Sequence, residues 1–366
     1  MSSRSGRSRR RAALAALLTG AAVVAAPKPL VRAQDDDLVV DRPRHITPRA
    51  AQAIERGVRW LAQKQRRDGA WDEGGGMGSY PVAMTALAGM AFLGHGDTPT
   101  RGKYAPNVRR AVTYLTDPRQ ASRTNGLITS RGTGEESRSM YGHGFATMFL
   151  AQALGDDGDP ALQRRVLEVL AKAVKLTGDS QSTRGGWLYT PDSGGDEGSV
   201  TVTQVQALRA CRNAGLAVPV RVVRQAVGYI EASAQPDGGI AYQVGMTGSQ
   251  PAITAAAVAV LYNAGQYDSP VARRCLEFCR QRIDVRGGGG GGFGHWFYTH
   301  LYLSQAYWQV GGQDWERYFP LVRDHLVNTQ GADGSWQGDG VGHVYGTAIA
   351  VTILTLPYEH VPLYMR

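Results

Sequence analysis

Three segments of the sequence share the pattern Gly-His-x-aromatic-x-Thr, at residues 142–147, 294–299 and 342–347. The histidines of the pattern are His143, His295 and His343. Neutral imidazoles can bind a metal ion or act as bases towards a ligand. A repeat that simply recurs along the chain explains the pattern as well, with the histidines in structural or capping roles. Both interpretations remain open at the level of sequence.

Acidic and aromatic residues accompany these histidines. Asp196 and Glu197 precede an expected helix, where a carboxylate either caps the helix or supplies a polar group at the mouth of a pocket. The aromatic residues expected to line such a pocket are Tyr80, Tyr141, Tyr189, Tyr298 and Tyr345, with Trp296 nearby. Aromatic walls stabilise carbocations and also stack on sugars, so they do not identify the ligand.

Other candidate sites are weaker. The glycine run 287–292 has no following Lys-Ser or Lys-Thr, so it is not a phosphate-binding loop. Cys211 lies in an apolar segment typical of a buried thiol. Cys275 and Cys279 are four residues apart, which permits a metal or redox pair on one helix face, although packing is the simpler interpretation. The sequence therefore predicts neither a metal ion nor a cofactor.

The elements that position these residues are marked by a repeated loop. Gln-x-x-Asp-Gly-x-Trp occurs at 65–71 and 330–336, with shorter versions at 235–239 and 185–187. In each copy we expect the Gln to end an amphipathic helix, the Asp-Gly to make the turn, and the aromatic residue to fold back onto the helix end. An apolar helix rich in Ala, Gly and Thr follows each loop. A helix without a polar face must be enclosed by other helices.

The pattern predicts twelve helices that alternate between an outer and an inner layer. The outer helices are expected at 48–65, 105–116, 160–177, 219–234, 268–283 and 314–329. The inner helices are expected at 80–93, 141–154, 199–213, 250–264, 295–310 and 343–356. Threonines near the start of the inner helices mark the repeat, at positions 85, 147, 203, 254, 299 and 347.

We therefore predict an all-α fold, an (α/α)6 toroid of six helical hairpins. An open solenoid of helix pairs is the alternative arrangement. Closure is favoured because the first and last hairpins carry the same Trp loop and neither end has a polar capping helix. The predicted organisation is a signal peptide over 1–33, a linker over 34–46, and one toroid domain over 47–366.

The first 33 residues have the pattern of an export signal. A basic start and an apolar run over 12–26 precede Val31-Arg32-Ala33, which resembles a cleavage site. The run is shorter than the roughly 20 residues that a membrane-spanning helix needs. Ser8 and three following arginines also suit the twin-arginine route, so the route stays open. We expect a periplasmic or extracellular protein without a transmembrane segment.

Removing this segment also removes the basic character of the chain. The segment holds 7 of the 40 Lys and Arg residues and none of the 31 Asp and Glu residues, so the remainder is nearly neutral. No basic patch interleaved with aromatics is left, and we do not expect nucleic-acid binding.

The repeated loops and several longer segments carry a family resemblance. The Trp loops resemble the repeats of squalene-hopene cyclases and of protein prenyltransferase β subunits. Segments 140–147, 185–189 and 344–356 are similar to secreted bacterial prenyltransferase and squalene oxidase repeat proteins. This resemblance implies the terpene cyclase type of α/α toroid. It implies no reaction, since the Asp-x-Asp-Asp acid motif of hopene cyclases and the zinc ligands of prenyltransferases are missing here.

The leading functional hypothesis is an exported toroid that holds an apolar isoprenoid or lipid-like ligand in its centre, as an enzyme or as a binder. A carbohydrate-active (α/α)6 enzyme is an alternative. It would pair Asp72 or Glu73 with Asp196 or Glu197 as acid and base. A protein-interaction scaffold with a centre plugged by large side chains is a further alternative.

Overall fold

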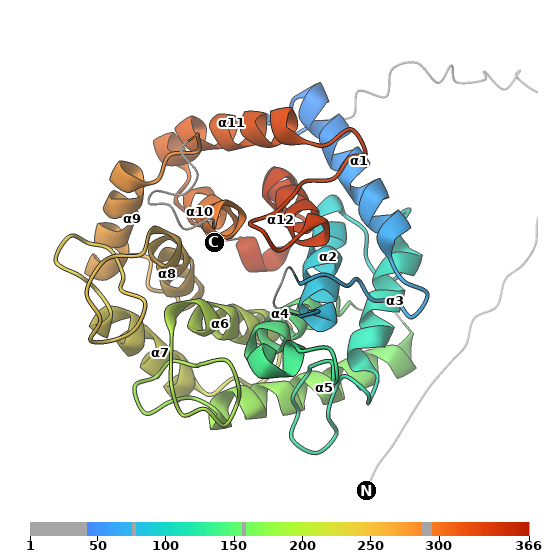
Figure 1. The fold of residues 1–366 in the computed structure, drawn as a ribbon, viewed down its shortest axis with the longest axis horizontal. Coiled ribbons are helices and arrows are strands. Elements are labelled where there is room, and N and C mark those ends of the chain that lie inside the picture. The colour runs from blue at the N-terminus through green and yellow to red at the C-terminus, as the bar shows by residue number, and fades with distance from the viewer. Residues whose placement is uncertain (1–41, 75–77, 156–158, 287–294, 366) are drawn as a thin grey trace, which may run out of the picture. The chain divides into compact units, whose positions relative to one another are not determined.

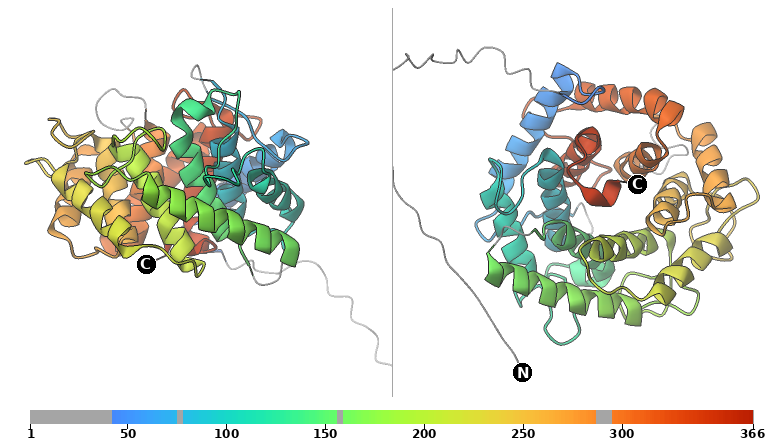
Figure 2. Two further views of the ribbon diagram at one scale, coloured as in Figure 1. Left: turned by 90° about the horizontal axis from the view of Figure 1, so that it is seen from below. Right: turned by 180° about the vertical axis from the view of Figure 1, so that it is seen from behind.

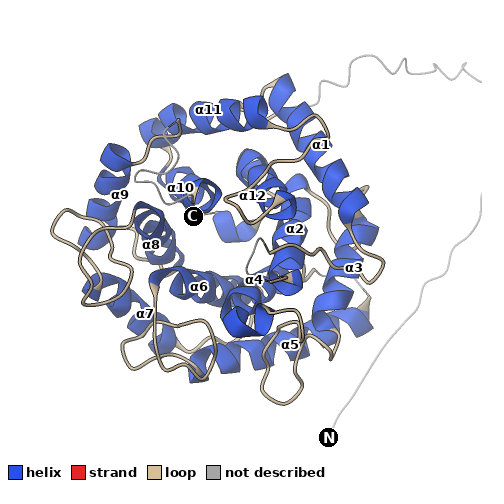
Figure 3. Ribbon diagram, viewed as in Figure 1, coloured by secondary structure: helices blue, strands red, loops and turns tan. Residues whose placement is uncertain are grey.

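The computed structural model describes residues 42–74, 78–155, 159–286 and 295–365. The predicted signal peptide and the glycine run 287–292 lie outside the described residues. Residues 42–366 form one compact unit. Within it the described segments contain helices and isolated β-bridges, without a longer strand (Figure 3).

Within the described residues, twelve α-helices form two concentric rings (Figure 1). The outer helices are α1 (Pro48–Lys64), α3 (Ala105–Thr116), α5 (Pro160–Asp179), α7 (Val220–Ala232), α9 (Pro270–Arg282) and α11 (Gly312–Thr329). The inner helices are α2 (Pro81–His95), α4 (Ser139–Gln152), α6 (Gly198–Asn213), α8 (Pro251–Asn263), α10 (Trp296–Val310) and α12 (His343–Thr355). The described chain also has three short 3-10 helices, η1 (Glu135–Arg138), η2 (Leu356–Tyr358) and η3 (Pro362–Tyr364). The predicted all-α toroid and its helix positions are confirmed.

The inner ring is closed. Each inner helix packs against the next one in chain order, and α12 packs against α2 (Figures 1 and 2). The open solenoid is therefore wrong for this chain. The inner helices are apolar on most sides because they are enclosed: in α2, every residue except His95 is buried.

One set of loop contacts is repeated in three hairpins. The indole N–H of the loop tryptophan donates to a carbonyl near the end of the preceding outer helix, at 2.8 Å in each copy. The pairs are Trp71 with Leu61, Trp187 with Thr177, and Trp336 with Leu326. These contacts confirm that the aromatic residue folds back onto the helix end, and they fix each inner helix against its outer partner.

The loop glutamines join neighbouring hairpins. Gln65 donates to the Asn107 carbonyl of α3, and Gln181 donates to the Val222 carbonyl of α7. Gln330, after the last outer helix, makes the same contact with the Ala53 carbonyl of the first one. The junction that closes the ring is therefore built like the junctions within it.

The loop threonines need one correction of register. Thr85, Thr201, Thr254 and Thr347 each accept the backbone N–H of the loop residue that precedes their inner helix. In α6 the repeated position is thus Thr201 and not the predicted Thr203. In α4 it is His143 and not Thr147, because His143 Nδ1 accepts the Ile128 N–H at 3.2 Å.

Candidate functional site

The N-terminal ends of the six inner helices lie together at one end of the ring, which we call the mouth. The free N–H groups and the parallel dipoles of these helices favour negative charge there. Four helices receive a carboxylate that accepts two consecutive backbone N–H groups. The pairs are Glu135 with α2, Glu197 with α6, Asp339 with α10 and Glu73 with α12.

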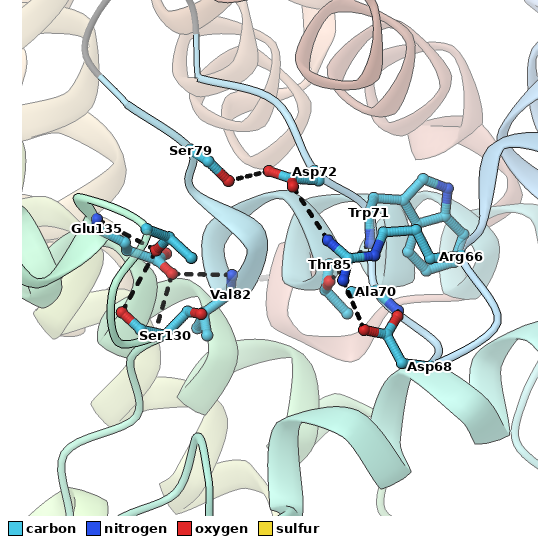
Figure 4. A network of polar contacts seen from close by, with 11 residues as sticks. Arg66, Asp68, Ala70, Trp71, Asp72, Ser79, Val82, Thr85, Ser130 and Glu135 are labelled. Carbon is cyan, nitrogen blue, oxygen red and sulfur yellow. Dashed lines mark hydrogen bonds and ion pairs between the residues drawn. The ribbon is translucent and has the colours of Figure 1, made fainter.

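Three of these carboxylates cap the inner helix of the neighbouring hairpin. Glu135 precedes α4 but accepts the N–H groups of Val82 and Ala83 in α2, at 3.0 and 2.9 Å (Figure 4). Asp339 precedes α12 and caps α10, while Glu73 precedes α2 and caps α12. The mouth is therefore a ring of loops in which each loop holds its neighbour.

Backbone carbonyls hold α4, and also α6, in the same direction. The Tyr189 carbonyl accepts the Met140 N–H of α4, and the Tyr242 carbonyl accepts the Gly198 N–H of α6. The loop that precedes α10 includes residues outside the described part. Each described loop that precedes an inner helix thus accepts N–H groups from the start of the inner helix of the preceding hairpin.

The capping role decides what these acids can do. Burial raises the pKa of Glu135 to about 7, and it raises the pKa of Glu197 and of Asp339. The N–H donors oppose this shift in each case. Both oxygens of Glu197 are engaged, by Ser199, Val200 and the Tyr141 hydroxyl. A carboxylate used in this way is poorly placed to donate a proton to a ligand.

The other acids named from the sequence are engaged as well. Asp196 is 1% exposed, and its Oδ2 accepts from Ser182 at 3.0 Å and from Arg184 at 2.9 Å. Asp72 pairs with Arg66 at 3.0 Å and accepts from the Ser79 hydroxyl (Figure 4). None of the four candidate acids presents both oxygens free of protein partners.

A cluster of tyrosines lies on the first two turns of α4, α10 and α12, near the mouth. We call Tyr141, Tyr298, Tyr302 and Tyr345 the tyrosine cluster. Burial raises the pKa of Tyr298 well above its usual value, and the neighbouring Tyr302, Tyr141, Glu197 and Tyr345 raise it further. Tyr141 lies on α4 and Tyr298 on α10, which are opposite one another in the inner ring (Figure 1). The hydroxyls of Tyr141 and Tyr298 therefore lie near one another although their helices face each other across the inner ring.

Hydrogen bonds fix the edge of this cluster. The Tyr141 hydroxyl donates to Glu197 Oε1 at 3.2 Å and also contacts the Ser199 hydroxyl. The Tyr345 hydroxyl donates to Asp339 at 3.4 Å. The two carboxylates that cap α6 and α10 thereby also orient two tyrosines of the cluster.

Tyr189 belongs to a second group at the rim. Its hydroxyl is 2.6 Å from that of Tyr242, and its ring lies 6.0 Å from that of Tyr141. The Arg138 guanidinium lies over the Tyr189 ring, 4.7 Å from its centroid. This part of the rim therefore places a guanidinium over an aromatic ring.

The three histidines of the sequence motif have different environments. His143 is fully buried. Its Nδ1 accepts the Ile128 N–H, and its Nε2 lies 3.1 Å from the Thr177 hydroxyl. Burial lowers its pKa to about 4. His295 ends the loop before α10 and is exposed, and His343 is exposed with Nδ1 2.9 Å from the Ser335 hydroxyl. His143 is thus not available to a ligand in the mouth.

Below the tyrosine cluster, glutamines cross the interior. Gln206 of α6 donates to Gln305 of α10 at 2.7 Å, although α8 separates these helices in the inner ring. α8 permits this contact because small alanines occupy much of it. Both glutamines are 1% exposed. The pair forms a polar belt across part of the ring.

The C-terminal segment closes the opposite end. Gln152 of α4 accepts the Leu363 N–H at 3.0 Å, and Gln309 of α10 donates to the Tyr364 carbonyl. Leu363 and Tyr364 are 1% and 5% exposed. Viewed along the axis, the end of the chain lies inside the inner ring (Figures 1 and 2). The C-terminal segment therefore occupies the end of the ring opposite the mouth.

The described residues contain no group of three or more His, Cys, Asp or Glu side chains that could hold a metal ion. Cys211, Cys275 and Cys279 are free and buried, and burial raises the pKa of Cys211 and Cys275 to about 12. Such thiols are protonated near neutral pH and are poor nucleophiles. Among the described helices, none is both long and apolar enough to span a bilayer.

Several residues of the site were not predicted from the sequence. Glu135 and Asp339 lie in loops, where no periodic pattern marks the residue that caps a helix of another hairpin. Tyr302, Gln305 and Gln309 follow Tyr298 at helical spacing, so a polar stripe on one inner helix was visible in the sequence.

Comparisons with known proteins support the fold. No family model matches the sequence, and no curated protein matches it. The type II terpene cyclase MstE from Scytonema is similar in structure, with a TM-score of 0.58 and 14% identity over 86% of this chain and 99% of the cyclase. A variant of a glycosidase has a TM-score of 0.61 and 12% identity, over 86% of this chain and 98% of the glycosidase. A protein from Actinoplanes has a TM-score of 0.56 and 20% identity, over 85% of this chain and 99% of that protein.

At these identities the comparisons establish the fold alone. The chain has the α/α toroid seen in the structures of a type II terpene cyclase and of a glycosidase. The expected terpene cyclase type of fold is confirmed.

Proposed function

We propose that this protein is an exported toroid that binds an isoprenoid or lipid-like molecule through its mouth. The observation that supports the proposal is the tyrosine cluster, in which hydroxyls from helices that face each other across the inner ring lie near one another. Aromatic surfaces give large apolar contact areas at low entropic cost, which suits a hydrocarbon chain. The cyclase MstE, which shares the fold, has been described in complex with geranylgeranyl dihydroxybenzoate, an isoprenoid compound.

The proposal is of binding and not of cyclisation. An alkene-protonating cyclase needs an acid aimed into an apolar chamber. In this chain Glu73, Glu135, Glu197 and Asp339 accept backbone N–H groups instead. The same use of carboxylates weakens the carbohydrate-active alternative, which requires two opposed acids that are free to act on a glycosidic bond.

The test is to search for a bound lipid and for turnover in the same preparation. The full chain is expressed, and the protein is purified without detergent and extracted for mass spectrometry. A second portion is incubated with squalene and prenyl diphosphates. We expect a co-purified or added isoprenoid to bind and remain unchanged. Absence of any bound lipid or isoprenoid would contradict the proposal, and a cyclised product would replace binding by catalysis.

A pair of variants locates the binding. Tyr298→Ala removes a ring from the tyrosine cluster and should lower isoprenoid binding at least about tenfold, because a large apolar contact is lost. Tyr358→Ala removes a half-buried ring at the opposite end of the toroid and should leave binding unchanged. Thermal unfolding of both variants controls for loss of folding. Equal binding by both would place the ligand elsewhere.

Export is the second part of the proposal. The support is the signal pattern in residues 1–33. Sequencing the N-terminus of protein recovered from outside the cytoplasm should give Gln34 as the first residue. Recovery of the uncleaved chain from the cytoplasm would contradict this part alone.

A further inference from the structure

Helix α10 carries a polar stripe that faces the ring axis. Its members are Tyr298, Tyr302, Gln305 and Gln309, spaced by four, three and four residues, so they share one face of the helix. Their partners establish the direction of this face. Tyr298 lies near Tyr141 of α4, Gln305 reaches α6, and Gln309 reaches the C-terminal segment.

Two hydroxyl groups of this stripe lack a well-formed hydrogen bond. The hydroxyls of Tyr298 and Tyr302 are buried and lie near one another, yet neither makes a hydrogen bond of normal length and angle to a described residue. Tyr302 is 0% exposed. Buried polar groups are nearly always paired, so an unpaired hydroxyl indicates either a missing water or a missing ligand group.

Elsewhere the same fold does pair a buried tyrosine hydroxyl. Tyr318 of α11 is engaged by His300 at 2.8 Å and by Ser304 at 2.9 Å. Single hydroxyls without a well-formed hydrogen bond also occur at Tyr104 and Tyr229, but Tyr298 and Tyr302 bring two of them together, one helical turn apart.

We infer that the ligand carries an oxygen atom that binds the hydroxyls of Tyr298 and Tyr302, so that the protein selects oxygenated isoprenoids over hydrocarbons. This inference rests on the proposed function and narrows it to a chemical class. A hydroxyl or carbonyl oxygen of the ligand accepts from one or both tyrosines. The apolar remainder contacts the rings of the tyrosine cluster.

The polar belt limits how deep the ligand reaches. Tyr298 lies seven residues before Gln305, and a helix rises 1.5 Å per residue, so the belt is about 10 Å below Tyr298. The ligand oxygen is therefore held between the mouth and the belt. A compact isoprenoid such as a fifteen-carbon prenol is the suitable probe.

The experiment compares farnesol with farnesene, which share a fifteen-carbon skeleton and differ in the hydroxyl group. Affinities are measured for the wild-type protein and for the variants Tyr298→Phe and Tyr302→Phe. These variants keep the rings and remove only the hydroxyls. Tyr229→Phe is the matched control, because Tyr229 is also buried with an unpaired hydroxyl but lies on the outer helix α7.

We expect the wild-type protein and Tyr229→Phe to prefer farnesol by about tenfold, the value of one or two neutral hydrogen bonds. Each cluster variant should lose most of that preference while its farnesene affinity stays unchanged. Equal wild-type affinities for the two probes would overturn the inference and leave the proposed function standing. A preference for farnesol that survives in both cluster variants would overturn the inference too, because the two hydroxyls would then bind water and not the ligand. Binding of neither probe would overturn the inference and count against the proposed function itself.

Discussion

His143 belongs to a motif that permits ligand or metal binding, but in the structure its ring holds a loop against the helices. Its ring joins the loop N–H of Ile128 to the hydroxyl of Thr177 between the inner and outer layers. In four other hairpins a threonine accepts the corresponding loop N–H. Both side chains can accept a hydrogen bond, so the sequence pattern alone did not reveal that they are equivalent.

Replacing His143 should therefore destabilise the fold and spare binding at the mouth. His143→Ala leaves the buried Ile128 N–H unpaired and opens a cavity, which should cost about 2 to 4 kcal/mol of unfolding free energy. His143→Asn can keep an acceptor for that N–H and should cost less. Chemical denaturation of the three proteins measures both effects. Equal losses for Ala and Asn would show that the hydrogen bond contributes little.

The same residue predicts a pH dependence with a definite sign. Its pKa is about 4 in the folded protein and 6.5 for a free imidazole. Between these values the unfolded chain takes up a proton that the folded protein does not, so acid lowers the unfolding free energy of the wild type. The stability difference between wild type and His143→Ala should shrink as the pH falls from 6.5 towards 4. A difference that is constant over this range would mean that His143 is protonated in the fold.

The loops are the elements that make the ring. Gly185 has φ +96°, and a Cβ there would meet the Gln225 carbonyl oxygen of the next outer helix. Gly334 has the same conformation against the Arg56 carbonyl, at the junction between the last and first hairpins. The repeated glycine is needed because the loop of one hairpin rests on the backbone of another.

Gly185→Ala should thus cost more than an ordinary glycine replacement. The positive φ and the backbone contact together predict a loss of about 2 to 4 kcal/mol. Gly215 is the control, since it has φ +83° with no atom within 4 Å of an added Cβ. Gly215→Ala should cost only about 1 kcal/mol. Thermal unfolding compares them, and equal losses would exclude the contact as the cause.

The carboxylate caps give a second test at this scale. Glu135→Ala removes the acceptor for two N–H groups of α2 and should cost about 1 to 3 kcal/mol. Glu168→Ala, at an exposed position of the outer helix α5, should change stability by less than about 0.5 kcal/mol. Hydrogen exchange should place the effect of Glu135→Ala at the start of α2. Loosening of α4 instead would contradict a cap that acts on the neighbouring hairpin.

For the molecule as a whole, the sequence predicted more of the fold than of the site. Loop signatures and helix periodicity predicted twelve helices and their closure into a ring. They could do so because the hairpins repeat similar loop residues and the same alternation of amphipathic and apolar helices. The site depends on contacts between residues far apart in the sequence. Glu73 caps a helix 271 residues away, and Tyr298 meets a tyrosine from the opposite wall. No local pattern carries that information.

Photoaffinity labelling with a farnesol analogue that carries a diazirine locates a bound isoprenoid on the protein. The labelled residues are identified by mass spectrometry, with unlabelled farnesol as competitor. We expect competed labels on the mouth-proximal turns of α4, α10 and α12, at or beside the tyrosine cluster. Labels confined to the outer helices, or labels that farnesol does not displace, would contradict this expectation.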